Sequence, residues 1–310
     1  MVYDNILGAT GRSPLVRLNR IPGSDCAEVL VKYEALEVGG SIKTRVAAAM
    51  VAGAERRGEL GPDSIIVEPT SGNQGIGLSL VGAVKGYRVR IVMPDSVSEE
   101  RRKLCQAYGA EVVLVHDEGD IGACIARCLE TALAMRDADP EHVWVPQQFD
   151  NPDNPEAHER ETGASILRDA GSAIDGFVSG FGTGGTLSGV GRVLKEANPD
   201  VRIWAAEPEE AAILSGGLIG THLQMGIGDG LIPKNLDRSV IDHVTIVTDD
   251  EALSMSRRLA REEGLVCGIS SGTNVTAALR LARELGPGRR VVTILPDTGE
   301  RYFSTPLFEE

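Results

Sequence analysis

The sequence predicts an α/β fold made of two doubly wound domains, each with a mostly parallel central sheet. Along the 310 residues, short apolar segments rich in β-branched residues alternate with amphipathic segments of helical period, which is typical of parallel sheets covered by helices. Glycine-rich loops follow several of the apolar segments and open the next helix. Two Asn-Pro pairs within residues 147–155 interrupt this alternation and indicate a boundary between two lobes.

Each element is assigned from its local pattern. Short runs of Val, Ile and Leu bounded by turn residues predict strands, at 29–33, 64–68, 88–93, 111–115, 142–145, 176–180, 202–207, 243–247 and 290–295. Apolar residues that recur every three to four positions predict helices, at 43–57, 75–85, 99–108, 120–138, 156–169, 186–197, 249–263 and 272–285. Ligands of such sheets bind at the carboxyl ends of the strands, so the loops opening helices are the first place to look for a site.

Composition argues against several classes of function. The chain is 42% hydrophobic and 25% charged, which is enough to build a packed core. Its net charge of −14 repels nucleic-acid backbones and anionic lipids, so we expect neither as a partner. The sequence shows no apolar run near the roughly 20 residues of a membrane helix and no signal-peptide pattern. We therefore expect a cytoplasmic protein.

The cysteines and histidines form no recognisable metal or disulfide pattern. Five cysteines are an odd number scattered along the chain, which does not indicate a disulfide framework. Cys124 and Cys128 are one helical turn apart, but no second pair and no nearby histidine completes a metal site. We expect buried or idle thiols and no metal.

A first candidate loop, at residues 37–45, contains two glycines and leads into a helix at Lys43. Of the six lysines, Lys43 is the one in a Gly/Ser loop at a helix start. The partial positive charge of a helix N-terminus favours the free amine, and a desolvated amine can attack a carbonyl group. The alternative is a solvated lysine in an ordinary loop.

Three further loops resemble ligand sites. Residues 68–75 place Thr70, Ser71 and Asn73 at a helix start, where they form a donor-rich nest for a carboxylate or a helix cap. Residues 179–186 hold four glycines and two threonines, which suits a phosphate at a helix N-terminus more than a merely tight turn. In residues 267–272, the Ser270 hydroxyl either meets a heterocyclic nitrogen or caps the helix.

The third loop also supports a competing hypothesis. Gly180, Gly182 and Gly185 match the G-x-G-x-x-G pattern, and Glu207 ends the next predicted strand, where a dinucleotide-binding fold holds a ribose. A nicotinamide-dependent enzyme is therefore an alternative. It leaves the first two loops without a role, and the two threonines suit a compact phosphate monoester better than a pyrophosphate.

One ligand satisfies all four loops. Pyridoxal 5′-phosphate joined to an amino acid offers an aldehyde for Lys43, a phosphate for residues 182–186, a pyridine nitrogen for Ser270 and a carboxylate for residues 70–75. The sequence therefore predicts a pyridoxal phosphate enzyme.

The chain resembles the cysteine synthase (O-acetylserine sulfhydrylase) and cystathionine β-synthase family of tryptophan-synthase-β-like pyridoxal phosphate enzymes. The matching stretches are 11–18, 39–45, 68–73, 93–94, 100–102, 148–158, 182–186, 226–228, 268–272 and 299–302. The resemblance implies fold type II of these enzymes. It also implies a smaller, mobile domain at 36–150 that carries loop 70–75, and a larger domain made of 1–35 and 151–310.

The resemblance also implies roles for individual residues. Lys43 forms the Schiff base with the cofactor and then acts as general acid and base at the substrate's Cα. Asn73 binds the cofactor's 3′-oxygen, and Ser270 meets its pyridine nitrogen. The phosphate is bound by Gly182, Thr183, Gly184, Gly185 and Thr186. The substrate is bound by Thr70, Ser71 and Gln148, which hold its carboxylate, and by Gly72, Gln74 and Gly226.

Two positions depart from the family's pattern. Gln74 replaces the usual threonine next to the substrate, and Glu37-Val38 replaces the usual Asn-Pro before the lysine loop. The longer amide of Gln74 changes the shape and the hydrogen-bond donors beside the substrate. We therefore expect neither a regulatory module after the motif that ends at Tyr302 nor a haem segment before the first motif.

The preferred hypothesis is a cysteine synthase that makes L-cysteine from O-acetyl-L-serine and sulfide through an aminoacrylate. A second hypothesis keeps the cofactor but takes cysteine, serine or phosphoserine as donor, and releases hydrogen sulfide or forms lanthionine or cystathionine. A nicotinamide-dependent oxidoreductase is a third hypothesis, and a non-catalytic docking module is a fourth. The resemblance further implies a homodimer and a possible complex with the C-terminal tail of a serine acetyltransferase.

Overall fold

Two sheets organise the chain in the computed structural model, which describes residues 2–119, 121–171, 173–217 and 219–309. In the larger sheet the strand order is β1-β2-β10-β7-β8-β9, and in the smaller one it is β5-β4-β3-β6. All pairs of neighbouring strands are parallel except β1 and β2, which are antiparallel. The prediction of an α/β fold with mostly parallel sheets is confirmed.

The strands follow the apolar segments closely. The larger sheet contains β1 (Leu15–Arg17), β2 (Glu28–Tyr33), β7 (Gly176–Gly180), β8 (Arg202–Pro208), β9 (His243–Val247) and β10 (Arg290–Leu295). The smaller sheet contains β3 (Ile65–Pro69), β4 (Arg88–Pro94), β5 (Glu111–Val115) and β6 (Val143–Trp144). The sequence analysis missed β1, because three residues at a sheet edge are too short to show an alternating pattern.

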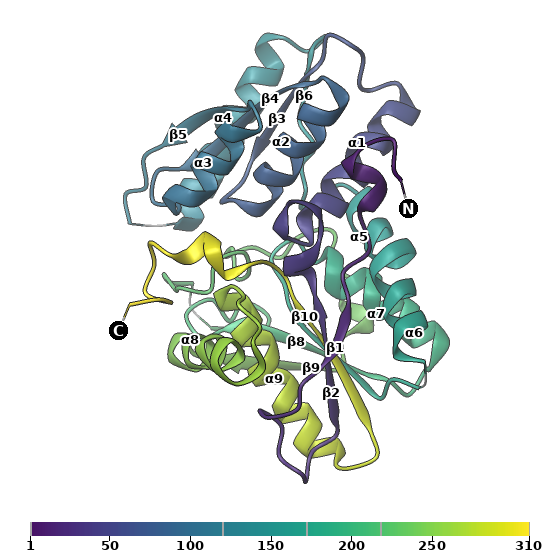
Figure 1. The fold of residues 1–310 in the computed structure, drawn as a ribbon. Helices are drawn as coiled ribbons and strands as arrows, with labels where there is room; N and C mark the ends of the chain where they lie inside the picture. Colours follow the sequence, from purple (N-terminus) through teal and green to yellow (C-terminus); the bar gives the residue numbers. More distant parts are fainter. Residues whose placement is uncertain (1, 120, 172, 218, 310) are drawn as a thin grey trace.

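Helices cover both faces of each sheet (Figure 1). They are α1 (Lys43–Arg57), α2 (Asn73–Lys85), α3 (Glu99–Ala107), α4 (Ile121–Ala138), α5 (Asp153–Ala157), α6 (Ala164–Ala170), α7 (Gly185–Ala197), α8 (Asp249–Arg258) and α9 (Ile269–Leu285). In the smaller sheet, α1, α2 and α3 bury their apolar side chains on one face, and α4 does so on the other. In the larger sheet, α8 and α9 pack on one face and α6 and α7 on the other. Each sheet is therefore doubly wound.

Several helix boundaries differ from the prediction. The segment predicted as one helix at 156–169 divides into α5, a π-helical turn at His158–Gly163 and α6. The helix predicted at 272–285 begins earlier, at Ile269, which places Ser270 inside its first turn. Asp120, the predicted start of the helix at 120–138, lies outside the described residues.

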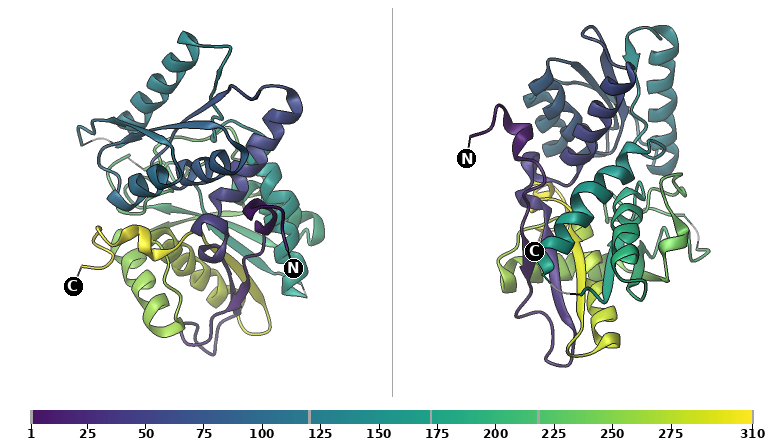
Figure 2. Two further views of the ribbon diagram at one scale, coloured as in Figure 1. Left: turned by 45° about the horizontal axis from the view of Figure 1, so that its top comes forward. Right: turned by 90° about the vertical axis from the view of Figure 1, so that its right-hand side faces the viewer.

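The chain passes between the two sheets twice. It leaves the larger sheet after β2, and it returns through residues 147–155 into α5. The two views in Figure 2 show the smaller sheet and its helices on one side and the larger sheet on the other. All strands of the smaller sheet lie between residues 36 and 150, and all strands of the larger sheet lie outside that range. This agrees with the expected boundaries, but the division into domains stays a prediction.

The cysteines are all buried and unpaired. Burial raises the pKa of Cys105 to about 11 and that of Cys128 to about 12. The pKa of Cys267 is likewise raised by burial to about 12. The expected burial of these thiols is confirmed, and their lack of a chemical role stays a prediction. None of the helices in the described residues has the length and apolar character needed to cross a membrane.

Candidate active site

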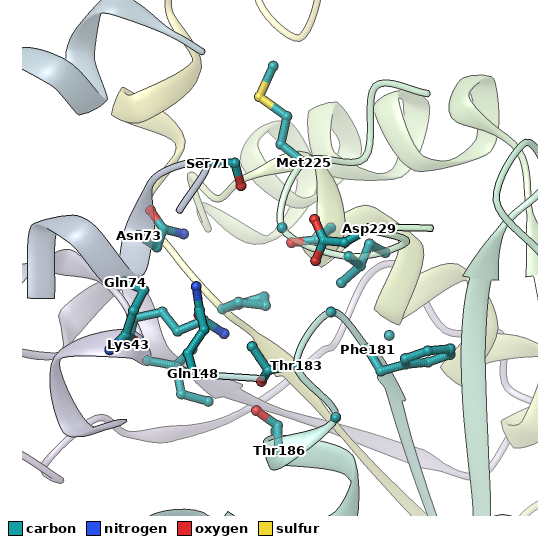
Figure 3. Close-up of a pocket in the computed structure, with 18 of the residues that line it drawn as sticks. Lys43, Ser71, Asn73, Gln74, Gln148, Phe181, Thr183, Thr186, Met225 and Asp229 are labelled. Atoms are coloured by element: carbon teal, nitrogen blue, oxygen red, sulfur yellow. The ribbon is translucent and has the colours of Figure 1, made fainter. Parts of the chain in front are cut away.

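The four loops that the sequence singled out meet at one cavity. It opens where the carboxyl ends of both sheets face each other, the position expected for a ligand site in such folds. Figure 3 shows Lys43, Asn73 and Gln148 pointing toward the same space as Thr183 and Thr186. Residues separated by more than 200 positions therefore contribute to a single site.

Lys43 is the first residue of α1, and its side chain lines the cavity. Within the described part of the chain its ammonium forms no ion pair, and burial lowers its pKa, against the opposing effect of Asp229 and Asp297. The environment therefore favours the neutral amine, which is the nucleophilic form.

A buried ion-pair network fixes the start of α1. The guanidinium of Arg45 is 1% exposed and donates to Glu37 at 2.7 Å and to Glu34 at 3.2 Å. Glu37 also accepts the backbone N–H of Gly11 at 2.8 Å. The departure from the family's Asn-Pro thus supplies a buried carboxylate for Arg45, which lies on the same helix as Lys43.

The loop between β7 and α7 is closely packed against its surroundings. A Cβ on Gly182 would lie 2.6 Å from the carbonyl oxygen of Gly226, and one on Gly185 would lie 2.1 Å from Oδ1 of Asn154. Gly184 has a φ of +78°, a conformation that L side chains rarely adopt. Gly182 and Gly184 line the cavity, whereas Gly185 packs against Asn154 behind it. The loop therefore requires glycine at these positions.

The two threonines of this loop are held from behind. The side-chain amide of Asn154 donates to the hydroxyl of Thr183 at 3.0 Å. The Thr186 hydroxyl lies 3.2 Å from Nε2 of His158. His158 is fully buried, and burial lowers its pKa well below the usual value, so the ring is neutral. The cradle is thus arranged before any phosphate binds.

Ser270 and Asn73 face the cavity from opposite sheets. Ser270 is 4% exposed in the first turn of α9. Asn73, at the start of α2, donates to Asp297 at 2.6 Å and accepts from Arg301. The sequence analysis missed this use of Asp297, because it lies 224 residues from Asn73.

The expected substrate residues line the cavity with one exception. Thr70, Ser71, Gln74, Gln148 and Gly226 are on its wall. Gly72 is not on this wall: a Cβ at this position would lie 2.3 Å from Cδ of Arg101.

Gln74 is 1% exposed, and neither end of its amide has a hydrogen-bond partner among the described residues. A buried amide without partners is costly, so this observation points to a polar ligand beside Gln74.

The structure adds Asp229 to the site, which the sequence analysis did not name. Its carboxylate points into the cavity (Figure 3), and a Cβ on Gly182 would lie 2.8 Å from it. Burial raises its pKa, while His222 and Lys43 oppose this shift. Asp229 directly follows the motif at 226–228. Its position next to that motif is the signal by which the sequence could have indicated it.

Glu68 is another buried acid that was missed, although it lies in the motif at 68–73. It is 0% exposed at the end of β3 and accepts the backbone N–H groups of Gln147 at 2.9 Å and Gln148 at 3.1 Å. Burial raises its pKa to about 8. Gln147 has a left-handed φ of 54°, so a strained turn is held against Glu68. This contact joins the loops that follow β3 and β6.

Glu207 does not lie where a dinucleotide enzyme would need it. Its carboxylate accepts the backbone N–H groups of Leu214 at 2.6 Å and Ser215 at 3.1 Å, and the residue is 1% exposed. Glu207 thus stabilises the loop after β8 and is not part of the cavity wall.

These residues fit pyridoxal phosphate on physical grounds. A desolvated amine, a glycine cradle with two held threonines, and a buried amide without partners converge on one cavity. Residues 6–297 match the family of pyridoxal-phosphate dependent enzymes. The chain belongs to this family. The predicted cofactor is therefore confirmed, and the nicotinamide hypothesis is set aside.

Individual relatives cover nearly the whole chain. A cysteine synthase of Staphylococcus aureus strain Mu50 is 48% identical over 307 residues, which are 98% of this chain and 97% of the relative. O-ureido-L-serine synthase is 44% identical with a TM-score of 0.92, covering 99% of this chain and 96% of the other. A hydrogen sulfide-producing enzyme of Fusobacterium nucleatum is 38% identical with a TM-score of 0.92, covering 97% and 100%. The resemblance inferred from the motifs is confirmed.

Proposed function

We propose that this protein is a cysteine synthase, which makes L-cysteine from O-acetyl-L-serine and sulfide by replacing a group on the substrate's Cβ. The observation that carries the proposal is the meeting of Lys43, the glycine cradle and loop 70–75 at one cavity. The 48% identity to a cysteine synthase over 98% of the chain supports the choice of reaction.

The geometry supports a cofactor-binding role for each of these residues. Lys43 would hold the cofactor's aldehyde carbon, and residues 182–186 would hold its phosphate at the N-terminus of α7. Ser270 and Asn73 would bind the ring nitrogen and the 3′-oxygen. Because Ser270 is a neutral partner, it stabilises a protonated ring less than a carboxylate would, which favours elimination at Cβ over transamination.

Pyridoxal phosphate supplies an electron sink for the pair released when the substrate's Cα–H bond breaks. Lys43 takes that proton at Nζ and returns it to Cα at the end, a role that its lowered pKa and its place in the cavity support. Asp229 lies close enough to influence the charge of Lys43. It gives the cavity a second group that can hold a proton.

The substrate's carboxylate would be bound by Thr70, Ser71 and Gln148, with Gly226 and Gln74 bordering its side chain. The Thr70 hydroxyl already accepts the N–H of Gly72 at 3.1 Å, which shapes the loop. We propose that the smaller domain, residues 36–150, carries loop 70–75 onto the carboxylate and expels water from the cavity.

The test is a panel of amino-acid donors given to the pyridoxal phosphate-loaded enzyme. O-acetylserine, phosphoserine, serine and cysteine are each supplied with sulfide or a thiol, and both cysteine and hydrogen sulfide are measured. We expect O-acetylserine with sulfide to give the highest kcat/KM. Turnover of cysteine with none of O-acetylserine would contradict the proposal.

A second candidate has a specific observation in its favour. Gln74 replaces the family's usual threonine, and its amide lacks partners among the described residues, so it can bind a donor or acceptor that a threonine cannot reach. The similarity to a hydrogen sulfide-producing enzyme agrees with this candidate. The reaction would then take cysteine as donor, release hydrogen sulfide, and form lanthionine with a second cysteine or cystathionine with another thiol amino acid. Serine and phosphoserine are further donors of this candidate, and the same panel decides among them.

We also propose that the enzyme is a cytoplasmic homodimer, as the family resemblance implies. Light scattering of the purified enzyme gives its mass in solution. A complex with a serine acetyltransferase is tested with a peptide from that enzyme's C-terminus, which would enter the cavity and compete with the donor for it. Failure of the peptide to compete would argue against the complex.

A further inference from the structure

Arg101 is a buried cation on the wall of the cavity to which the proposed function gives no role. It lies in the first turns of α3, is 2% exposed and lines the cavity. A guanidinium carries five N–H donors and a permanent charge. Burying it is costly unless an anion or several acceptors surround it.

The contacts of Arg101 leave this requirement unmet. Its Nη1 donates to the sulfur of Met225 at 2.9 Å, and a thioether is a weak acceptor. Its Nε is buried with no hydrogen-bond partner among the described residues. The ring of Tyr302 lies 4.9 Å from Cζ. Within the described ranges, Arg101 forms no ion pair with a carboxylate.

Positive charge is in excess around Arg101. Arg301 is also 2% exposed, and it donates to Asn73 and to the carbonyl oxygen of Gly39. Burial lowers the pKa of Arg301; the charge of Asp297 opposes that shift, and the nearby charge of Arg101 adds to it. The carboxylate of Asp297 accepts from Asn73 at 2.6 Å and from Tyr302 at 2.8 Å, both through Oδ2, and its Oδ1 has no hydrogen-bond partner among the described residues. Within the part of the chain that the structure describes, neither guanidinium forms an ion pair with a carboxylate.

Arg101 lies apart from the phosphate cradle. Its Cδ and Nε pack beneath Gly72, next to Ser71, and its Nη1 reaches Met225. Figure 3 shows Ser71 and Met225 on the side of the cavity away from Thr183 and Thr186. An anion at Arg101 would thus be distinct from the cofactor's phosphate.

We propose that Arg101, on the Met225 side of the cavity, forms a second oxyanion subsite, which binds a carboxylate or phosphate carried on the reacting side of the substrates. This inference rests on the proposed function. The oxyanion would belong either to the donor's leaving group or to the incoming thiol, and it is additional to the donor's own α-carboxylate. Guanidinium groups bind such oxyanions with two parallel hydrogen bonds. Sulfide carries no oxyanion and leaves the subsite unfilled.

The test compares matched pairs on the pyridoxal phosphate-loaded enzyme. The acceptor pair is mercaptoacetate and 2-mercaptoethanol, and the donor pair is phosphoserine and O-acetylserine. We expect the wild-type enzyme to favour the anionic member of at least one pair by about tenfold in kcat/KM, the size of one charge-assisted hydrogen bond. Preference within the acceptor pair identifies the thiol as the source of the oxyanion. Preference within the donor pair identifies the leaving group, and it would also make phosphoserine, in place of O-acetylserine, the favoured donor.

Two variants assign the preference to Arg101. In Arg101→Met the ratio between anionic and neutral members should fall to near one. Met225→Glu keeps the guanidinium but gives it a carboxylate, and it should abolish the preference as well, whereas Met225→Leu should preserve it. This second route keeps the test valid if Arg101→Met does not fold.

Three results would overturn the inference. One is the absence of a preference within both pairs in the wild-type enzyme. Another is an equal loss for all substrates in Arg101→Met, which would mean that Arg101 supports loop 70–75 or the α-carboxylate. If no donor reacts, the proposed function fails separately. Binding of phosphoserine and serine, followed by the cofactor's absorbance, then decides, and equal affinities would reject the subsite.

Discussion

The two walls of the cavity differ in how completely their polar groups are paired. On the cofactor wall, residues 180–186 with Asn154 and His158, both threonine hydroxyls are held and the glycines pack against backbone or side chains. Its one buried side-chain atom without a partner among the described residues, Oδ1 of Asn154, packs against Gly185 away from the cavity. The substrate wall, residues 70–74 with Arg101 and Gln148, contains Gln74 and the Nε of Arg101 without partners among the described residues.

This difference separates what is constant in the chemistry from what selects the substrate. A prearranged cradle binds one fixed group with little reorganisation. Unpaired buried donors and acceptors bind most tightly the ligand that forms hydrogen bonds with them. A ligand that leaves them unpaired binds more weakly. We infer that the cofactor wall accepts pyridoxal phosphate in every reaction of this fold, and that the substrate wall determines which donor and acceptor react.

The largest effect should come from Lys43→Ala, since it removes the group that both walls surround. Activity should fall by about a thousandfold or more, and borohydride should no longer fix the cofactor to the protein. Mass spectrometry after reduction measures this. Lys85→Ala, at a surface lysine paired with Glu55, is the control. Covalently fixed cofactor in Lys43→Ala would refute the assignment.

Gly185→Ala tests whether close packing of the cofactor wall is needed to bind the cofactor. The added methyl group would lie 2.1 Å from Asn154, and overpacking of this kind costs about 1–3 kcal/mol. The affinity for pyridoxal phosphate should fall by roughly tenfold to a hundredfold, as measured by titration of the cofactor-free protein. Gly61→Ala is the matched control, because its methyl group would meet nothing within 4 Å. Equal affinities for pyridoxal phosphate in the two variants would show that the loop can move to accommodate the added methyl group.

Gln74→Thr probes the substrate wall alone. Preference among the donors should move toward O-acetylserine by about tenfold, the scale of one altered side-chain contact, while affinity for the cofactor stays the same. Competition between O-acetylserine and cysteine, with both products measured, gives the ratio directly. An unchanged ratio would show that Gln74 does not select the donor.

Glu68→Gln should act on the pH dependence of stability and not on the choice of donor. Burial raises the pKa of Glu68 to about 8 from the usual 4.5. Between these values the native state therefore holds one proton more than the unfolded chain. The free energy of unfolding then falls as pH rises through this range, by at most about 1.4 kcal/mol per pH unit from this group.

The variant should make that decline shallower, which urea unfolding of the cofactor-free protein at several pH values can measure. Glu130→Gln, at an exposed position on α4, should leave it unchanged. Identical slopes in the wild-type protein and Glu68→Gln would mean that Glu68 is ionised when buried, and that the substrate wall is held by a charge.

Local sequence was enough to predict most of the framework. The strands from β2 to β10 follow apolar runs. The loops that reach the cavity can be recognised in the sequence by their glycine and hydroxyl residues at helix starts. Such signals work because backbone conformation and helix capping depend on neighbouring residues. The strand β1 and the start of α9 at Ile269 were not found, since tertiary pairing fixes them.

The residues that hold the site in place were largely out of reach. Asp297 contacts Asn73 across 224 positions, and Arg101 reaches Met225 across 124. Glu68 depends on the turn at Gln147, which only the packing of β3 beside β6 brings near. No local pattern records such contacts, because the two partners meet only after both sheets have formed.

The burial of all five cysteines has a consequence for an enzyme that handles reactive sulfur. Persulfide formation and disulfide exchange require an accessible thiolate. Cys105, Cys128 and Cys267 keep their protons well above neutral pH, with pKa values of about 11, 12 and 12. These three thiols therefore stay protonated and shielded while sulfide or thiols pass through the cavity, so they do not exchange with disulfides that form when the product is oxidised in solution.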